Sequence, residues 1–260
     1  KPFWDSFFGY HNFQRLLSVV NSHEQPWWFF GLILLISSLP FTPFLLLSIY
    51  KEFIRLINIK DKSFQLPSES LNRFVFCWLI SILLFFTTAA TKLPSYWLPA
   101  TPAAAILIAI CAQNSENKNP FHSLAWIISC LISLGLAISF YASSNWIYSI
   151  NDPEMPDLVE EFLSSGIYQN AFFVIATGTF LAILCSSKFR KGRLILLQIP
   201  FIFVHLFVVL PIWELGDRLR QFPLRQASEL ILDSQRENEF IAMVGINKPS
   251  IHFYTNKIII

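Results

Sequence analysis

The sequence predicts an all-α polytopic membrane bundle of about six transmembrane helices. Of the 260 residues, 54% are hydrophobic and only 14% are charged. The mean hydropathy is +0.50, whereas a soluble domain carries about 25% charged residues. The apolar residues also lie in blocks close to the length of about 20 residues that crosses a bilayer as a helix. Membrane lipids are therefore the expected surroundings, and a net charge of +2 is too small to indicate a nucleic-acid partner.

Residues 1–26 come before the first apolar block and are too polar to span a membrane. Their aromatic and aliphatic side chains recur at mixed helical spacing, which is typical of a juxtamembrane helix lying in the outer interface. The alternative is a helix that packs on the bundle without touching lipid.

Residues 27–215 contain six blocks that predict six spans. The second and third blocks are short, which indicates a tight outer reversal between Thr91 and Ser95. Prolines inside the blocks are compatible with membrane helices, because neighbouring groups can satisfy the carbonyls they free. The predicted spans are 27–50, 74–91, 96–112, 121–145, 170–187 and 194–214.

The charged residues predict which side of the membrane each loop faces. Loops 51–73, 113–120 and 188–193 hold ten of the nineteen basic residues, whereas loop 146–169 holds five acidic residues and no basic one. Because Lys and Arg collect on the cytoplasmic side, the three basic loops are expected there. The N-terminal segment, the turn at Lys92, the acidic loop and the C-terminal tail then face outward.

Residues 216–260 are predicted to begin an extracytoplasmic α/β domain. An amphipathic helix is expected from Pro223 to Ser234, a buried strand over 240–244, and further strands over 251–254 and 257–260. These residues are too few to close a core. The chain also begins without Met, so we expect it to be a fragment of a longer protein.

The sequence has no GxSxG, GxGxxG, Walker or HExxH motif. The residues that stand out are two cations predicted at the outer interface. Lys92 lies in the short turn beside Tyr96, and Arg15 lies one helical turn after His11. Cations framed by aromatic residues at this depth can bind a lipid phosphate while the tail of the lipid stays in the bilayer. The alternative is that both side chains only anchor their helices by reaching the interface.

Three segments carry a resemblance to a known family. Thr91–Pro99, which reads TKLPSYWLP, resembles the KLPxYxLP-type motif of GT-C glycosyltransferases of the bacterial protein mannosyltransferase-like and aminoarabinose-transferase-like family. Residues 10–15 and 23–30 are similar to the juxtamembrane segment of that family, and residues 248–255 are similar to its PSLxFYT stretch. The three matches occur in family order and extend over most of the chain.

The resemblance implies a membrane glycosyltransferase with an outward-facing active site, placed in the bacterial inner membrane. Its donor would be a polyprenyl-phosphate-linked sugar, and its acceptor a lipid, a glycan or a protein. Lys92, Tyr96 and Arg15 match residues that line the lipid-phosphate cavity of the aminoarabinose branch. The family's catalytic aspartate lies in a first outer loop that has no counterpart here. We therefore expect no catalytic residue in this chain, and no activity from it alone.

Two questions stay open at this point. Some relatives use a divalent metal ion, for which His11, His23 and Glu24 are candidate ligands; the alternative is that the histidines bond only to backbone or water. The other functional readings are a transporter or flippase for a lipid-linked glycan and a non-catalytic membrane scaffold. An ion-coupled pathway needs charged residues deep in several spans, and the six blocks carry none near their centres.

Glu214 and Asp217, at the outer end of the last predicted span, are further candidates for lining the cavity. The acidic loop is expected to be solvated.

Overall fold

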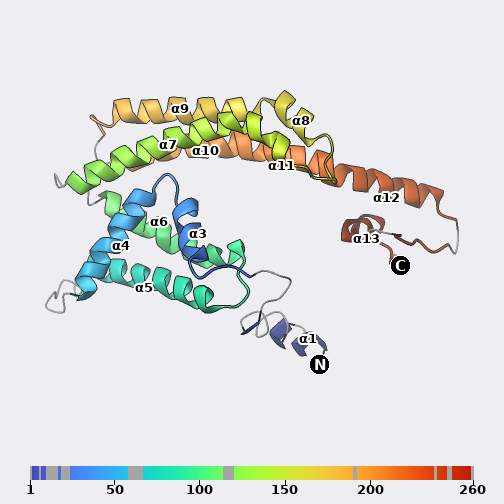
Figure 1. Ribbon diagram of the computed structural model, residues 1–260, viewed down its shortest axis with the longest axis horizontal. Helices are drawn as coiled ribbons and strands as arrows, with labels where there is room; N and C mark the ends of the chain where they lie inside the picture. Colours follow the sequence, from blue (N-terminus) through green and yellow to red (C-terminus); the bar gives the residue numbers. More distant parts are fainter. Residues whose placement is uncertain are drawn as a thin grey trace. The chain divides into compact units, whose positions relative to one another are not determined.

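The computed structural model describes residues 2–5, 7–9, 17–18, 24–57, 67–113, 120–189, 192–236, 239–244 and 248–258. The chain divides into two compact units, Lys1–Ser133 with Ala182–Leu196, and Leu134–Leu181 with Leu197–Ile260. Within the described ranges every regular element is helical, apart from one isolated β-bridge. The predicted all-α bundle is confirmed (Figure 1).

The first unit is built around one buried helix. Both α4 and α5 pack on α6, and Leu45, Leu79 and Leu107 from these three helices are fully buried between them. The unit also holds α3 and η3, which pack on α5. Its described elements are α1 (Pro2–Trp4), α3 (Phe29–Ser37), α4 (Thr42–Ile57), α5 (Pro67–Thr88), η3 (Pro94–Ala100), α6 (Thr101–Gln113) and the first half of α7 (Pro120–Trp146).

The first predicted span, 27–50, is not one continuous helix. It breaks between Ser37 and Thr42, because Pro40 has no N–H to continue the ladder and its ring disfavours a helical residue before it. The hydroxyl of Thr42 donates to the carbonyl of Leu35 at 2.8 Å across the break. The nine residues of α3 rise only about 14 Å, half of the bilayer core. In addition α4 continues to Ile57, so residues 51–57, predicted as loop, are helical.

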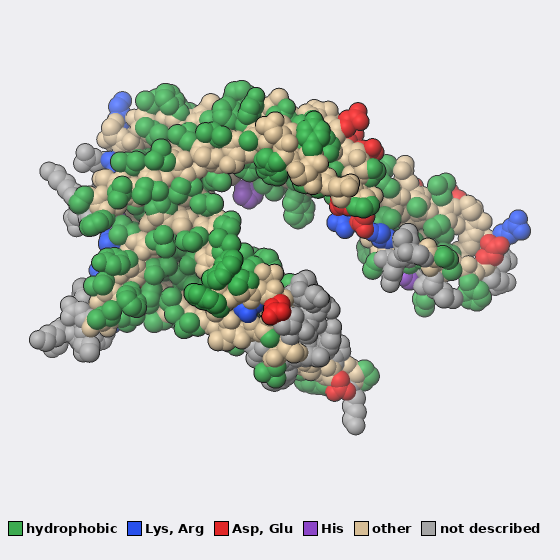
Figure 2. Space-filling view, viewed as in Figure 1, with side chains coloured by type: hydrophobic (Ala, Val, Ile, Leu, Met, Phe, Trp, Pro, Cys, Tyr) green, Lys and Arg blue, Asp and Glu red, His purple; other side chains and the backbone are tan. Residues whose placement is uncertain are grey.

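The other five predicted spans are confirmed as helices long and apolar enough to cross a membrane. Among the described residues these helices are Ser70–Thr88, Pro94–Gln113, Pro120–Ser149, Ile167–Cys185 and Arg193–Ser234. Large apolar side chains such as Leu131, Phe173 and Phe180 are exposed on them, and Figure 2 shows hydrophobic side chains covering their surfaces. Such a surface is stable against lipid and not against water, so the chain is a multi-pass integral membrane protein.

The second unit consists of long helices lying side by side. Ala137 of α7, Ala171 and Ile175 of α9 and Val208 of η7 form its buried core, and Figure 1 shows these helices running alongside one another. Gly166 adopts a left-handed conformation that ends α8 and lets α9 begin at the next residue. The remaining elements are η5 (Ile147–Ser149), α8 (Leu158–Ser165), α9 (Ile167–Cys185), α10 (Arg193–Val204), η7 (His205–Val209), α11 (Leu210–Gly216), η8 (Asp217–Gln221), α12 (Phe222–Ser234) and α13 (Pro249–Thr255).

The last span continues without a break into the predicted amphipathic helix. Residues Arg193–Ser234 form one helix of 42 residues, which at 1.5 Å per residue is about 63 Å long. The sequence indicated an end at residue 214, but two π-helical turns, η7 and η8, carry the helix past Pro211 and Pro223. Each π turn begins six residues before a proline and contains the residue four positions before it, whose carbonyl would clash with the proline ring in a regular α-helix. The wider π turn leaves room for the ring.

The strands predicted in the tail do not form in the described residues. Residues 240–244 have no regular structure, and Phe240 and Val244 are about nine-tenths exposed. Residues 251–254 belong to α13, which packs on α12 and buries Ile251. A strand needs a neighbour to take its N–H and C=O groups, and the described residues of the tail provide none, whereas Pro249 favours the start of a helix. The boundaries of the predicted extracytoplasmic domain, 216–260, stay a prediction.

The contact between Gly178 of α9 and Pro200 of α10 gives a first test. A Cβ at position 178 would lie 2.8 Å from Cγ of Pro200, and closer still to its Cβ. We expect Gly178→Ala to destabilise the protein by about 1–3 kcal/mol through overpacking. Gly135→Ala is the matched control, because a Cβ there meets nothing within 4 Å. Thermal unfolding in detergent measures both, and equal midpoints would disprove the close contact.

Candidate functional site

The turn that follows α5 holds Lys92 in a defined position. Lys92 is only 9% exposed, and its Nζ donates to the carbonyl of Ala89 at 2.8 Å. Ala89 follows the end of α5, where the last carbonyls have no partner within the helix and a cation is favoured. An ammonium has three donors. Lys92 is therefore fixed by one bond and keeps further donor capacity.

The aromatic residues of the motif follow on η3. The ring of Tyr96 lies 4.9 Å from the ring of Phe86 on α5. Trp97 is 5% exposed, and its Nε1 is buried with no hydrogen-bond partner among the described groups. The sequence indicated Trp97 only as an aromatic neighbour, because hydropathy does not show whether an indole N–H finds an acceptor. A buried donor of this kind favours a site for an acceptor atom.

The juxtamembrane segment reaches this turn at two points. The hydroxyl of Thr91 donates to the carbonyl of Ser18 at 3.0 Å, and Glu24 forms an antiparallel bridge with Thr91. The segment is thus joined to the residue next to Lys92. Arg15, predicted to share the phosphate site, is three residues before Ser18 but lies outside the described residues, as do His11 and His23.

The predicted metal ligands are described only at Glu24, which is exposed. No group of three His, Cys, Asp or Glu side chains that could hold a metal ion occurs within the described part of the chain. Because only one of the three predicted ligands is described, the structure does not test whether they could bind a metal ion together. A site made of His11, His23 and Glu24 stays a prediction, and no chemistry is assigned to it.

A second polar cluster, which the sequence did not indicate, joins α4 to α7. Nζ of Lys51 lies 2.8 Å from Nε2 of His122, and Sγ of Cys111 lies 3.8 Å from the same nitrogen. Next to Lys51, the buried carboxylate of Glu52 accepts a hydrogen bond from Arg55 at 2.8 Å. These residues lie near helix ends and not near span centres. The cluster links helices of the first unit and adds no polar path through it.

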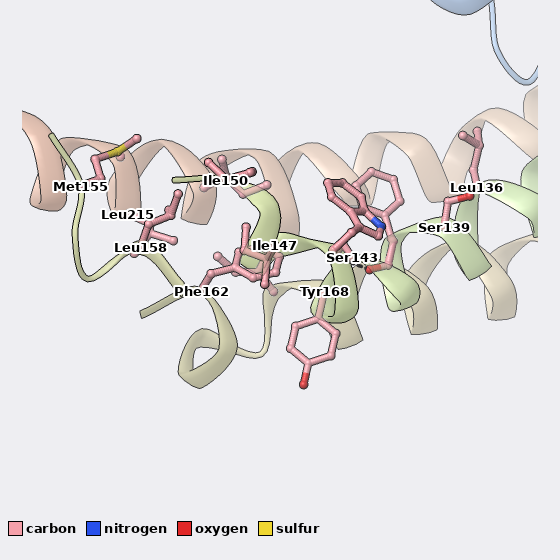
Figure 3. Close-up of a pocket in the computed structure, with 15 residues that line it drawn as sticks. Leu136, Ser139, Ser143, Ile147, Ile150, Met155, Leu158, Phe162, Tyr168 and Leu215 are labelled. Atoms are coloured by element: carbon pink, nitrogen blue, oxygen red, sulfur yellow. Dashed lines mark hydrogen bonds between the residues drawn. The ribbon is translucent and has the colours of Figure 1, made fainter. Parts of the chain in front are cut away.

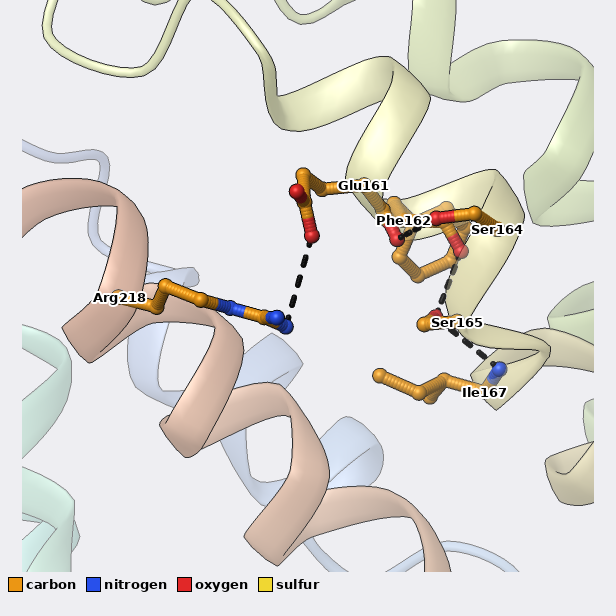
Figure 4. Close-up of polar contacts among 6 residues, drawn as sticks. All are labelled: Glu161, Phe162, Ser164, Ser165, Ile167 and Arg218. Atoms are coloured by element: carbon orange, nitrogen blue, oxygen red, sulfur yellow. Dashed lines mark hydrogen bonds and ion pairs between the residues drawn. The ribbon is translucent and has the colours of Figure 1, made fainter.

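The acidic loop of the second unit pairs with the long helix and the tail. Glu154 binds Arg220 at 2.8 Å and also binds Lys248. Glu161 lies 3.5 Å from Arg218, across the space between α8 and η8 (Figure 4). The predicted solvated surface is therefore also a network of exposed ion pairs.

The two further cavity candidates lie on the same helix. Asp217 bonds to Arg225 at 3.0 Å, and Glu214 is exposed. Neither lines the apolar cavity that this unit contains. Their assignment to a catalytic cavity stays a prediction.

The described part is thus a multi-pass membrane protein in which a cationic KLPSY turn is joined to a juxtamembrane segment. The motifs of the sequence predicted a multi-pass membrane protein of this kind. Comparison with known proteins confirms the resemblance to the aminoarabinose-transferase-like GT-C glycosyltransferases. Residues 234–260 match the family model for the cyanobacterial RgtA-type glycosyltransferase, C-terminal domain.

The individual relatives are undecaprenyl phosphate-alpha-4-amino-4-deoxy-L-arabinose arabinosyl transferases. The chain is 29% identical over 158 residues to transferase 1 of Sodalis glossinidius (strain morsitans), covering 58% of this chain and 26% of the relative. It is also 29% identical over 138 residues to those of Yersinia pestis (strain Pestoides F) and Yersinia pseudotuberculosis serotype O:1b (strain IP 31758), covering 52% of this chain and 23% of each relative. The chain spans about a quarter of their length. No solved structure matches it significantly.

The ion pairs of Glu154 give a prediction about pH. The hydrogen bond from Lys248, with the nearby charge of Arg220, lowers the pKa of Glu154 below its ordinary value. Because the pKa of Glu154 is lower in the folded state, its ion pairs stabilise the folded protein. This stabilisation is complete above the unfolded-state pKa of about 4.3, and it is lost as the pH falls through the lower folded-state pKa. We expect the amide hydrogens of α13 to be less protected below that pH, where protection is the exchange rate compared with intrinsic exchange at the same pH.

The matched variant for this test is Glu154→Gln. It should lower the protection of α13 already at pH 7 and remove the further loss of protection at acid pH, while Glu160→Gln, for which no ion pair is seen among the described residues, should behave as the parent protein. Hydrogen exchange read by mass spectrometry measures all three proteins. Equal protection in Glu154→Gln and the parent at pH 7 would contradict the assignment.

Proposed function

We propose that this chain is part of a membrane glycosyltransferase that moves a sugar from a polyprenyl-phosphate-linked donor to a lipid, glycan or protein acceptor on the non-cytoplasmic face. One observation carries the proposal. The ammonium of Lys92 is buried in the motif turn, where one of its N–H groups bonds to the carbonyl of Ala89 and the others remain able to donate. The juxtamembrane segment contacts the neighbouring residue, Thr91. The named relatives, whose carrier is undecaprenyl phosphate, support this class of donor.

The proposed reaction is displacement at the anomeric carbon of the donor sugar. The bond from that carbon to the phosphate oxygen breaks, the acceptor oxygen or nitrogen forms the new bond, and the prenyl phosphate leaves. Negative charge grows on the leaving phosphate, so a fixed cation beside it lowers the barrier. Burial strengthens this effect, because charges interact more strongly where water is excluded. The base that takes the acceptor's proton is proposed to lie in another part of the protein.

Three residues of this chain are proposed to hold the phosphate. Lys92 supplies the fixed charge and Tyr96 a phenolic O–H, and Arg15 supplies a second, fork-shaped cation. The contact of Ser18 with Thr91 supports Arg15 in this role, since the two residues are three positions apart in one segment. Trp97 adds an indole N–H that lacks an acceptor. The prenyl chain would extend from this site into the bilayer.

Replacing Lys92 tests the proposal in the full-length protein. We expect Lys92→Ala to lower kcat/KM for a polyprenyl-phosphate sugar about 100-fold or more, as loss of one directed donor does elsewhere. Lys92→Arg should restore part of the activity, because it keeps the charge. Lys188→Ala, on an exposed loop residue, is the control. Unchanged transfer in a folded Lys92→Ala protein would reject the site.

Trp97→Phe tests the indole N–H separately. If the indole N–H forms a hydrogen bond to the phosphate of the sugar substrate, its loss should raise KM about tenfold or more, because a hydrogen bond to a charged group contributes about 1.5–3 kcal/mol. If the N–H only remains unsatisfied, Phe should leave KM unchanged and the protein at least as stable. Trp213→Phe is the control, since Trp213 is 76% exposed. Steady-state kinetics and thermal unfolding together decide between the two.

A further inference from the structure

The second unit contains an elongated apolar cavity of about 550 Å³. Its walls come from α7, η5, α8, α9 and α11, and they are aliphatic and aromatic apart from two serines and the phenol of Tyr168. The hydroxyls of Ser139 and Ser143 donate to carbonyls of their own helix. The cavity therefore offers a ligand apolar contact and almost no hydrogen bonding. Its lining includes Leu136, Phe140, Ile147, Met155, Phe162 and Leu215.

The length of the cavity matches the depth of one leaflet. Figure 3 shows its lining following α7 from Leu136 to Ile147 and continuing to Met155. Eleven residues of helix between Leu136 and Ile147 rise about 16 Å. Half of the hydrocarbon core of a bilayer is about 15 Å. The cavity thus extends from the middle of a span to its end.

Aromatic residues mark that end as the membrane–water boundary. Trp146 is the last residue of α7, Tyr148 lies two residues later in η5, and Trp213 lies on α11 one residue from the lining residue Ile212. All three are more than half exposed. Exposed Trp and Tyr side chains gather where lipid head groups begin. The mouth of the cavity is therefore at the head-group level.

The mouth carries charges of both signs. Glu161 comes directly before the lining residue Phe162, and Arg218 comes two residues after the lining residue Gly216. Their side chains pair at 3.5 Å and are 38% and 57% exposed (Figure 4). Exposed ion pairs contribute little net stability, so a lipid head group can separate Arg218 from Glu161 and bind to both at a small cost in free energy. Asp157 and Glu160 are also exposed on the same loop and helix.

We propose that the cavity binds one acyl chain of a zwitterionic glycerophospholipid of the phosphatidylethanolamine type. The chain fills the apolar slot, Arg218 binds the phosphate, and Glu161 binds the ammonium group. An anionic phospholipid lacks the ammonium and would bring its charge beside Asp157, Glu160 and Glu161. This site is built from residues of the second unit alone, and it does not depend on the proposed sugar transfer.

Gly216 permits a direct test, because a side chain added there enters open space. A Cβ at Gly216 meets no atom within 4 Å, and the residue lines the cavity. We therefore expect the ring of Gly216→Phe to occupy the slot. Gly135→Phe is the matched control, since Gly135 is also helical, also open at Cβ, and does not line the cavity. Both changes replace glycine by a better helix former, so both proteins should fold.

The experiment uses the full-length protein in nanodiscs that contain phosphatidylethanolamine with a photoreactive diazirine on its acyl chain. After irradiation, mass spectrometry should place cross-links on lining residues such as Met155 and Phe162. We expect Gly216→Phe to lose about tenfold of this labelling, because the pocket volume is occupied, and Gly135→Phe to keep it. Labelling that is equal in the two variants, or that falls outside the cavity, overturns the proposal.

A second arm tests the head group. Diazirine-labelled phosphatidylglycerol in matched nanodiscs should label the cavity several-fold less than phosphatidylethanolamine, since it lacks the cationic group. Arg218→Ala should lower the labelling by phosphatidylethanolamine. Equal labelling by the two lipids rejects the zwitterionic lipid. Sugar transfer measured in the same nanodiscs separates this site from the proposed function, because Lys92→Ala should lower transfer about 100-fold or more and leave the labelling unchanged.

Discussion

The structure depends on one constraint, which is that backbone N–H and C=O groups inside a bilayer must find partners within the protein. A continuous helix meets this requirement by itself, and the described part of the chain is accordingly helical almost throughout. The same constraint explains the local structure at three of the prolines. At Pro40 the helix ends, and side-chain and backbone groups bond the freed carbonyls. At Pro211 and Pro223 the helix widens into a π turn and continues.

The constraint also explains why Lys92 can be buried where the proposed site needs it. A cation far from water is costly unless a partner is supplied. The end of α5 supplies one, because its last carbonyls have no acceptor role within the helix and Ala89 lies beside them. The ammonium is thus held by the backbone and not by a carboxylate. A carboxylate would compete with a phosphate for the same charge, whereas a single carbonyl leaves the charge available.

Five spans and the place of the KLPSY turn between two of them could be predicted, because hydropathy and a specific motif report on each. The contact of Ser18 with Thr91 could not, because the sequence does not show where the juxtamembrane segment packs. The break at Pro40 and the π turns could not, because a proline predicts the loss of a bond and not whether the chain stops or widens. The tail strands were predicted from apolar runs, but a strand exists only with a partner. The bond from Lys51 to His122 and the lone indole N–H of Trp97 depend on tertiary packing, which no local pattern encodes.

The long last helix determines how the C-terminal part of the described chain is built. Its 42 residues are about twice the length that a bilayer core requires, so roughly half of it extends beyond the hydrocarbon. The sequence predicted that the span ends at residue 214 and that a separate amphipathic helix begins at Pro223. Instead the extension is the same helix as the span, α13 packs on α12, and Arg218 and Arg220 pair with the acidic loop of the same unit. Because the helix is continuous, residues 216–234 follow the direction of the span, and the backbone hydrogen bonds along the span also fix the course of this extension.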